Sequence, residues 1–196
     1  MSTSTRQPAA SPARSEALRL RKPQPRDGGR VWQLIRECPP LDRNSMYCNV
    51  LQCTDFADTC IMAELENRIV GWISGYRPPA DDGTLFIWQV AVHEQARGMG
   101  LAKKMLSRLL QRSACKDVAY LKTTITEDNA PSRALFQSFA DHRDAPLEET
   151  AGFDEELHFR GQHDSERLIT IGPFAGNGAG TRANEANDSA SERSAA

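Results

Sequence analysis

The sequence predicts a single α/β domain in which helices flank a mixed central β-sheet. Its 196 residues suffice for one domain with a sizeable core and are few for two. Apolar, β-branched runs alternate along the chain with segments whose apolar residues recur at helical spacing. The predicted order of elements is β-α-α-β-β-β-α-β-α-β. We expect residues 18–174 to form the domain, between disordered polar tails at 1–17 and 175–196 that lack the apolar residues needed for a core.

The domain is expected to begin with a short strand and a helix. Residues 18–21 alternate as in a strand. Residues 28–38 carry apolar side chains at helical spacing behind Asp27, a possible helix cap, and Pro39-Pro40 ends this helix.

A second helix and a hairpin are expected next. The helix lies within 41–56, with Asn44 as a possible cap. Two β-rich runs within 59–77 flank Glu66-Asn67-Arg68 and predict a hairpin, because Asn tolerates the positive φ of a tight turn. The residues expected on one face of the second helix are Tyr47, Val50 and Leu51.

The second half of the domain is expected to alternate strands with helices. The expected elements are a strand at 84–92, a helix at 101–112, a strand at 118–126, a helix at 129–139 and a strand at 167–174. The first of these strands, TLFIWQVAV, is apolar enough to be buried on both faces. Around 152–159 the pattern does not decide between a strand and a loop. The core stripe expected on the first helix is Leu101, Met105, Leu106, Leu109 and Leu110.

The composition excludes several classes of protein. A formal net charge of −2 gives no general basic field, so we do not expect nucleic acid as a partner. The apolar runs are too short to cross a bilayer and the first residues lack a signal-peptide core, so we expect a cytoplasmic protein without a membrane partner. The 5 cysteines include no C-x-x-C pair and are expected to be free, mostly buried thiols, with no metal bound.

Two glycines stand where the strand at 84–92 passes into the helix at 101–112. A helix N-terminus attracts phosphate, and glycines let the phosphate approach the backbone. A P-loop is excluded because Gly98 and Gly100 are followed by Leu-Ala-Lys-Lys. A dinucleotide-binding fingerprint is disfavoured because Lys103 occupies the position of its third glycine.

The remaining pattern is Q-x-x-G-x-G after a Val-Ala-Val strand end, and it resembles the coenzyme loop of the GCN5-related N-acetyltransferases (GNAT). The resemblance implies the GNAT fold, with strands that splay apart where acetyl-coenzyme A binds. It implies that backbone amides of the loop and the next helix hold the pyrophosphate, and that an N–H near Val90 stabilises the acetyl oxygen. Asn129 is implied as a coenzyme contact, although a helix cap explains it equally well. The coenzyme-binding residues implied by the resemblance are Val90, Val92, Gln95, Arg97, Gly98, Gly100, Leu101, Ala102 and Asn129.

One position departs from the GNAT pattern. Many members carry a Tyr on the helix at 129–139 that protonates the departing thiolate, whereas this sequence has Phe136, which has no proton to give. Tyr47 is a candidate for that acid or for a coenzyme contact, and water is the alternative.

Four segments, one of which includes the glycine loop, resemble the diaminobutyrate acetyltransferases of ectoine biosynthesis. They read CPPLD-x-NS-x-Y, WQVAV-x-x-x-ARG-x-GLA, TTIT-x-DN and HD-x-E-x-L-x-x-IGPF, and the resemblance spans roughly 18–174. It implies transfer of acetyl to the γ-amine of L-2,4-diaminobutyrate, which gives N-γ-acetyl-diaminobutyrate, and it implies a homodimer.

The chemistry of such an acceptor directs attention to four side chains. Amines titrate near 10 in water and must lose a proton before they attack a thioester, so the site needs a base. We expect Glu166 to accept that proton and Asp42 to fix the substrate. Trp88 is expected to supply a flat wall or a cation–π face, and His163 is a further substrate-binding candidate. Each residue also has an ordinary structural explanation. Asp42 could be a helix cap or turn acid and Glu166 a solvated acid, while Trp88 could be a core residue and His163 a loop histidine.

Two other functions remain open from the sequence. A protein N-terminal or lysine acetyltransferase would need an open peptide groove, which the polar stretch 140–166 would line. A non-catalytic acyl-coenzyme A-binding module would tolerate Phe136.

Overall fold

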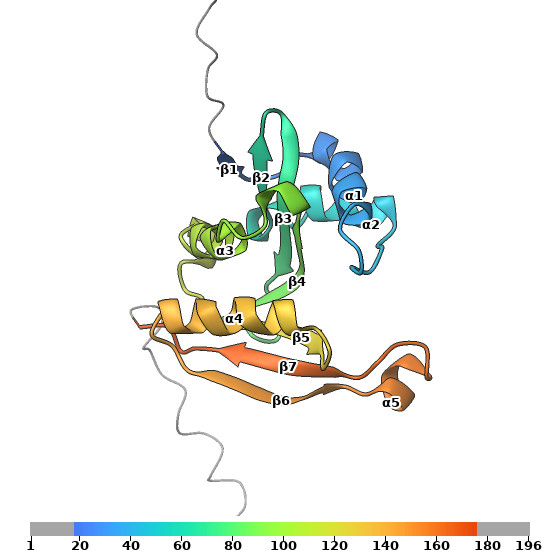
Figure 1. The fold of residues 1–196 in the computed structure, drawn as a ribbon. Coiled ribbons are helices and arrows are strands. Elements are labelled where there is room, and N and C mark those ends of the chain that lie inside the picture. The colour runs from blue at the N-terminus through green and yellow to red at the C-terminus, as the bar shows by residue number, and fades with distance from the viewer. Residues whose placement is uncertain (1–17, 176–196) are drawn as a thin grey trace, which may run out of the picture.

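The computed structural model describes residues 18–175, which form a seven-stranded mixed sheet flanked by helices (Figure 1). The strand order is β1-β2-β3-β4-β5-β7-β6. The strands are β1 Arg19–Arg21, β2 Ile61–Leu65, β3 Arg68–Tyr76, β4 Thr84–Val92, β5 Tyr120–Thr126, β6 Leu147–Phe153 and β7 Glu166–Ile171. The helices are α1 Gly28–Arg36, α2 Met46–Thr54, α3 Leu101–Leu110, α4 Ala130–His142 and α5 Glu155–Phe159. The predicted α/β fold with a mixed sheet is confirmed, and the two tails expected at the ends lie outside the described residues, apart from Ala175.

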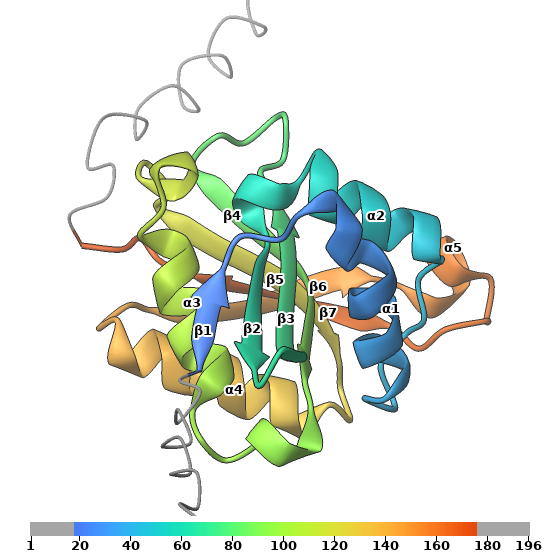
Figure 2. The same cartoon turned by 90° about the horizontal axis from the view of Figure 1, so that it is seen from above.

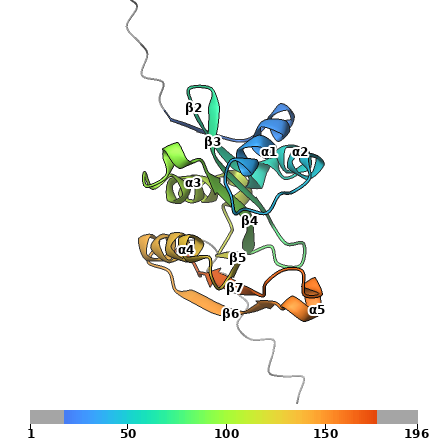
Figure 3. The same cartoon turned by 45° about the vertical axis from the view of Figure 1, so that its right-hand side comes forward.

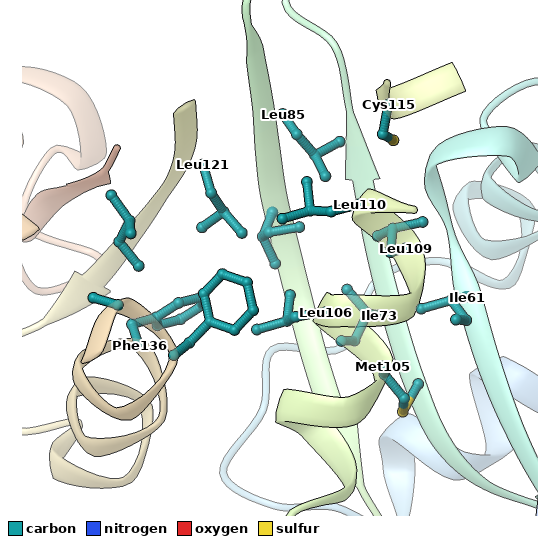
Figure 4. Close-up of a cluster of buried hydrophobic side chains, with 14 of the residues drawn as sticks. Ile61, Ile73, Leu85, Met105, Leu106, Leu109, Leu110, Cys115, Leu121 and Phe136 are labelled. Carbon is teal, nitrogen blue, oxygen red and sulfur yellow. The ribbon is translucent and has the colours of Figure 1, made fainter. Parts of the chain in front are cut away.

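The helices divide between the two faces of the sheet. Helices α1 and α2 lie on the opposite side from α3 and α4 (Figure 2). Residues of α3 and α4 pack with the sheet in the larger hydrophobic cluster, part of which is drawn in Figure 4. The five residues predicted as the core stripe of α3 are all buried there. Residues of α1 pack in the smaller cluster around Trp72.

Strands β4 and β5 are parallel neighbours that pair over only part of their lengths. The paired residues are Thr84 with Tyr120, Leu85 with Leu121 and Phe86 with Lys122. Beyond them β4 continues to Val92 and β5 to Thr126 without further pairing between the two. The predicted splaying of these strands is therefore confirmed.

A β-bulge at Trp88 changes which way the side chains of β4 point. Gln89 pairs with Ser74 of β3 and Ile87 pairs with Gly75, so Trp88 has no partner on that strand. The side chain of Trp88 is 49% exposed. The expectation that this strand is buried on both faces is therefore wrong at Trp88, a residue with no partner on β3.

Helix α2 differs from the prediction in its cap and in its buried face. Ser45, rather than Asn44, caps the helix, since the Ser45 hydroxyl accepts the Cys48 N–H. The buried side chains are Asn49, Gln52 and Cys53, whereas Tyr47 is 71% exposed. The two amides satisfy each other in part through a 2.9 Å hydrogen bond from Asn49 Nδ2 to Gln52 Oε1. The sequence predicted the wrong buried face because that prediction relied on the spacing of apolar residues, whereas two of the residues that α2 buries carry polar amides.

Asp27 precedes α1, but its side chain does not cap the helix. The buried carboxylate instead accepts hydrogen bonds of 2.7 and 2.9 Å from Arg21 and one of 2.8 Å from the Gln24 N–H. The ion pair with Arg21 therefore takes the place of the capping role that the sequence predicted for Asp27.

The hairpin and the region left open around 152–159 are both resolved by the structure. Leu65 pairs with Arg68, so the hairpin turns over Glu66 and Asn67, both with positive φ. Strand β6 pairs with β7 and ends at Phe153. Helix α5, which the sequence did not predict, follows its N-cap Asp154.

All 5 cysteines are free, and all except Cys48 are buried. Within residues 18–175, no helix has both the length and the apolar composition that a membrane span requires.

Candidate active site

The glycine loop connects the end of β4 to the start of α3. Gly98 and Gly100 have φ values of 76° and 66°, in the left-handed region that favours glycine. A Cβ atom added to either glycine would meet no atom within 4 Å beyond its own neighbours in the chain. The glycines are therefore required by the backbone conformation, and their open sides leave room for a ligand.

The first turn of α3 presents unpaired N–H groups beside this loop. Gly100 is the N-cap and supplies no side-chain acceptor. The Lys104 N–H bonds to the Gly100 carbonyl, while the amides of Leu101 and Ala102 have no acceptor among the described residues. An N-terminal turn of this kind binds anions. The residues present therefore fit a pyrophosphate group.

Two side chains tie the loop to the end of β4. His93 is buried, and its Nδ1 accepts the Gln95 N–H at 3.3 Å. Arg97 Nε donates to the Val92 carbonyl at 3.1 Å, while the side chain of Gln95 is exposed. Val90 and Val92 are half-buried and pack against the larger hydrophobic cluster.

Asn129 stands at the start of α4, just after β5 has separated from β4. Its Oδ1 accepts the Ser132 N–H at 3.1 Å, so Asn129 acts as a helix cap. Its amide nitrogen makes no hydrogen bond within the described residues and remains available to a ligand. The capping role and the predicted coenzyme contact are therefore compatible.

A cluster of three ionisable side chains joins the loop between α1 and α2 to the start of β7. His163 Nε2 lies 3.5 Å from Asp42 Oδ2 and 3.9 Å from Glu166 Oε1. The α1–α2 loop and the α5 end of the β6–β7 pair lie on the same side of the molecule (Figures 1 and 3). The structure thus brings together three residues that the sequence singled out in two distant segments.

The charge on His163 depends on these neighbours. Nδ1 donates to the Asp164 carbonyl at 2.7 Å. This hydrogen bond raises the pKa of His163 above its ordinary value of 6.5, partial burial opposes the rise, and the charges of Asp42 and Glu166 add to it. Nε2, facing two carboxylates, is favoured in its protonated form.

Three aromatic side chains from β3 and β4 contact one another. The Tyr76 ring contacts Trp88 edge-on at 6.4 Å and Phe86 at 5.3 Å between centroids. The exposed indole of Trp88 is therefore held by Tyr76 and is not a plain core residue. Tyr47 is exposed, and its hydroxyl makes no hydrogen bond within the described residues.

Phe136 lies in the interior. It is 2% exposed and belongs to the same cluster as Leu106 and Leu121 (Figure 4). It contributes packing and has no proton to transfer.

One residue of the site was missed from the sequence. Gln89 is 8% exposed, and its Nε2 donates to the Asp42 carbonyl at 2.8 Å. The available signal was a single amide inside the apolar run FIWQVAV. Among residues 18–175 no grouping of His, Cys, Asp and Glu side chains could hold a metal ion.

Comparison with known proteins agrees with this geometry. Residues 29–140 match the acetyltransferase (GNAT) family. The chain is 45% identical over 157 residues to the L-2,4-diaminobutyric acid acetyltransferase of Methylotuvimicrobium alcaliphilum, covering 80% of this chain and 91% of that protein. It is 47% identical over 152 residues to the enzyme of the same description from Vibrio parahaemolyticus, covering 78% and 84%.

A solved structure is similar over the same region. It is the diaminobutyrate acetyltransferase EctA of Paenibacillus lautus in complex with its substrate L-2,4-diaminobutyric acid and coenzyme A. The TM-score is 0.78 at 44% identity, covering 81% of this chain and 96% of that one. The chain therefore belongs to the GNAT acetyltransferase family and, within it, to the L-2,4-diaminobutyric acid acetyltransferases.

Proposed function

We propose that this protein transfers the acetyl group of acetyl-coenzyme A to the γ-amine of L-2,4-diaminobutyrate. The product would be N-γ-acetyl-diaminobutyrate, a precursor for ectoine. The observation that carries the proposal is the similarity to the Paenibacillus lautus enzyme, whose structure holds both diaminobutyric acid and coenzyme A. The cluster of Asp42, His163 and Glu166 supports it, because an acceptor with two ammonium groups needs anionic partners.

Acetyl-coenzyme A would be held at the glycine loop. The amides from Gly98 to Ala102 donate to the pyrophosphate, and the N-terminus of α3 adds its positive dipole. Gln95, Arg97 and Asn129 complete the coenzyme site. The Val90 N–H donates to the acetyl oxygen as negative charge develops on it.

The acceptor side has to hold the amine and remove its proton. Asp42 holds an ammonium group of diaminobutyrate, with His163 between it and Glu166. Glu166 accepts one proton of the γ-ammonium, directly or through a water, and the nitrogen lone pair then forms the new C–N bond. The second proton leaves the nitrogen for solvent as the tetrahedral intermediate collapses to the amide. Trp88 forms the wall against which the amine approaches the thioester.

Breaking the C–S bond leaves a thiolate that needs a proton. Tyr47 donates this proton in our proposal, because Phe136 is not able to. The exposed hydroxyl of Tyr47 on α2 is consistent with that role. We further propose that the protein acts as a homodimer in the cytoplasm.

The proposal is tested by measuring thiol release from acetyl-coenzyme A. The purified protein is offered diaminobutyrate, ornithine, lysine or a peptide with a free N-terminus, and the product is identified by mass spectrometry and NMR. We expect turnover with diaminobutyrate and acetylation at its γ-nitrogen. Release with peptides alone would indicate a protein acetyltransferase, and no release with any amine would indicate a non-catalytic coenzyme-binding module.

A further inference from the structure

Gln89 connects the strand that carries Trp88 to the loop that carries Asp42. The bulge at Trp88 shifts the alternation of β4, so that Ile87 and Val90 both face the larger cluster and Gln89 faces the α1–α2 loop. The side chain of Gln89 is 8% exposed.

Both polar atoms of the Gln89 amide form hydrogen bonds with the α1–α2 loop. Nε2 donates to the Asp42 carbonyl at 2.8 Å, and Oε1 accepts from Asn44 Nδ2 at 3.4 Å. The pair of contacts spans the three residues from Asp42 to Asn44. Replacing the Gln89 amide removes both contacts, so this side chain no longer ties the loop to β4.

The Asp42 carboxylate has little else to fix its position. It is 81% exposed, and among the described residues its charged neighbour is His163. The place of the carboxylate therefore depends on the main chain at Asp42, which Gln89 holds.

We propose that Gln89 is a positioning residue that sets the Asp42 carboxylate relative to Glu166 and thereby selects the length of the diamine. The inference rests on the proposed function, in which these two carboxylates serve the two ends of the acceptor. Gln89 acts through Asp42 and does not touch the substrate. Loosening the loop weakens binding of diaminobutyrate and reduces discrimination against its longer homologue ornithine.

The test compares Gln89→Met with Gln52→Met. Both replacements remove a buried amide of similar shape, but Gln52 is bonded to Asn49 and not to the Asp42 loop. We expect Gln89→Met to raise KM for diaminobutyrate about tenfold and to leave KM for acetyl-coenzyme A within about twofold. The preference for diaminobutyrate over ornithine falls in parallel. Gln52→Met lowers Tm and leaves both KM values and the preference unchanged.

A double-mutant cycle separates positioning from general destabilisation. In an Asp42→Asn background, Gln89→Met adds less than about twofold to KM, because the group it positions has already lost its charge. An equal rise in KM for acetyl-coenzyme A, or a full tenfold effect in the Asp42→Asn background, overturns the inference. If Gln89→Met does not fold, Asn44→Ala removes the outer contact alone and is expected to raise the amine KM about threefold, and no change there overturns the inference as well.

The failure of this inference is distinguishable from failure of the proposed function. Turnover of diaminobutyrate by the unmodified protein tests the function, whereas the Gln89 variants are compared only with that protein. Should another amine prove to be the substrate, the same cycle is measured with that amine.

Discussion

His163 Nε2 lies 3.5 Å from Asp42 Oδ2, and this contact joins the loop before α2 to the segment that enters β7. Because Nδ1 already donates to the Asp164 carbonyl, Nε2 carries a proton only in the imidazolium form. A charged His163 offsets the two carboxylates around it. A neutral His163 leaves both of them to attract the ammonium groups of a diamine.

The first prediction concerns pH. The pKa of His163 is raised above 6.5, so kcat/KM for diaminobutyrate should increase as the pH rises through that pKa and His163 loses its charge. Asp42→Asn removes one of the causes of the shift and should move the His163 pKa down toward 6.5. An NMR titration of the imidazole C–H signals measures both values. His158→Gln is the control, since His158 bonds to the Asp154 N–H and leaves His163 untouched, and an unaltered His163 pKa in Asp42→Asn would contradict the prediction.

The second prediction concerns the base. Glu166→Gln keeps the shape of a side chain that is 20% exposed but is not able to accept a proton, so kcat should fall about 100-fold or more. KM for acetyl-coenzyme A should not change. The deficit should narrow as the pH approaches about 10, where the free amine no longer needs a base. Glu148→Gln on β6 alters an exposed acid and serves as the control in the same steady-state assay, and wild-type kcat in Glu166→Gln would show that another group is the base.

The coenzyme loop could be predicted because its determinants are local. The strand end, Gly98, Gly100 and the amphipathic α3 occupy one continuous stretch, and the left-handed backbone at both glycines agrees with what their residue type permits. Helix boundaries and the core stripe of α3 follow from the same short-range pattern.

The acceptor side could be predicted only as a set of candidate residues. Asp42 and Glu166 meet at His163 because β7 inserts between β5 and β6, an order that no local pattern reveals. The unpaired position of Trp88 and the direction of the Gln89 side chain both depend on a bulge against β3. Pairing between strands decides both, so the sequence of β4 alone predicted a buried strand instead.

The third prediction concerns Gly100. An alanine at φ 66° is strained by about 1–2 kcal/mol, and its methyl group projects into the space left open beside the first turn of α3. Gly100→Ala should therefore lower Tm and raise KM for acetyl-coenzyme A, with little change in KM for diaminobutyrate. Gly29→Ala is the matched control, because Gly29 lies inside α1 with nothing near its missing Cβ and should stabilise the protein by about 0.5–1 kcal/mol. Thermal unfolding and coenzyme titration measure the two effects, and equal behaviour of the two variants would be inconsistent with a glycine-specific loop.

The fourth prediction concerns stability in acid. Burial on its own raises the pKa of Asp27, but hydrogen bonds from Arg21 and the Gln24 N–H, with the charges of Arg21 and Arg30, outweigh it and lower the pKa below 3.8. A lowered pKa in the folded state stabilises the protein above the unfolded value, and this contribution is lost as the pH falls through the folded value. Asp27→Asn should therefore cost about 3 kcal/mol near neutral pH, because it leaves part of the charge on Arg21 unpaired at a nearly buried site.

Urea unfolding from pH 7 down to about pH 3 measures this contribution as the difference between wild type and Asp27→Asn. The difference should shrink as the pH falls below about 4, where Asp27 takes up a proton in the unfolded chain and then in the folded one. Asp58→Asn provides the comparison, since Asp58 pairs with Lys22 at the surface and should contribute less than about 1 kcal/mol at any pH. A difference for Asp27→Asn that stays constant over this range would mean that packing at α1, rather than the ionised carboxylate, holds β1 and α1 together.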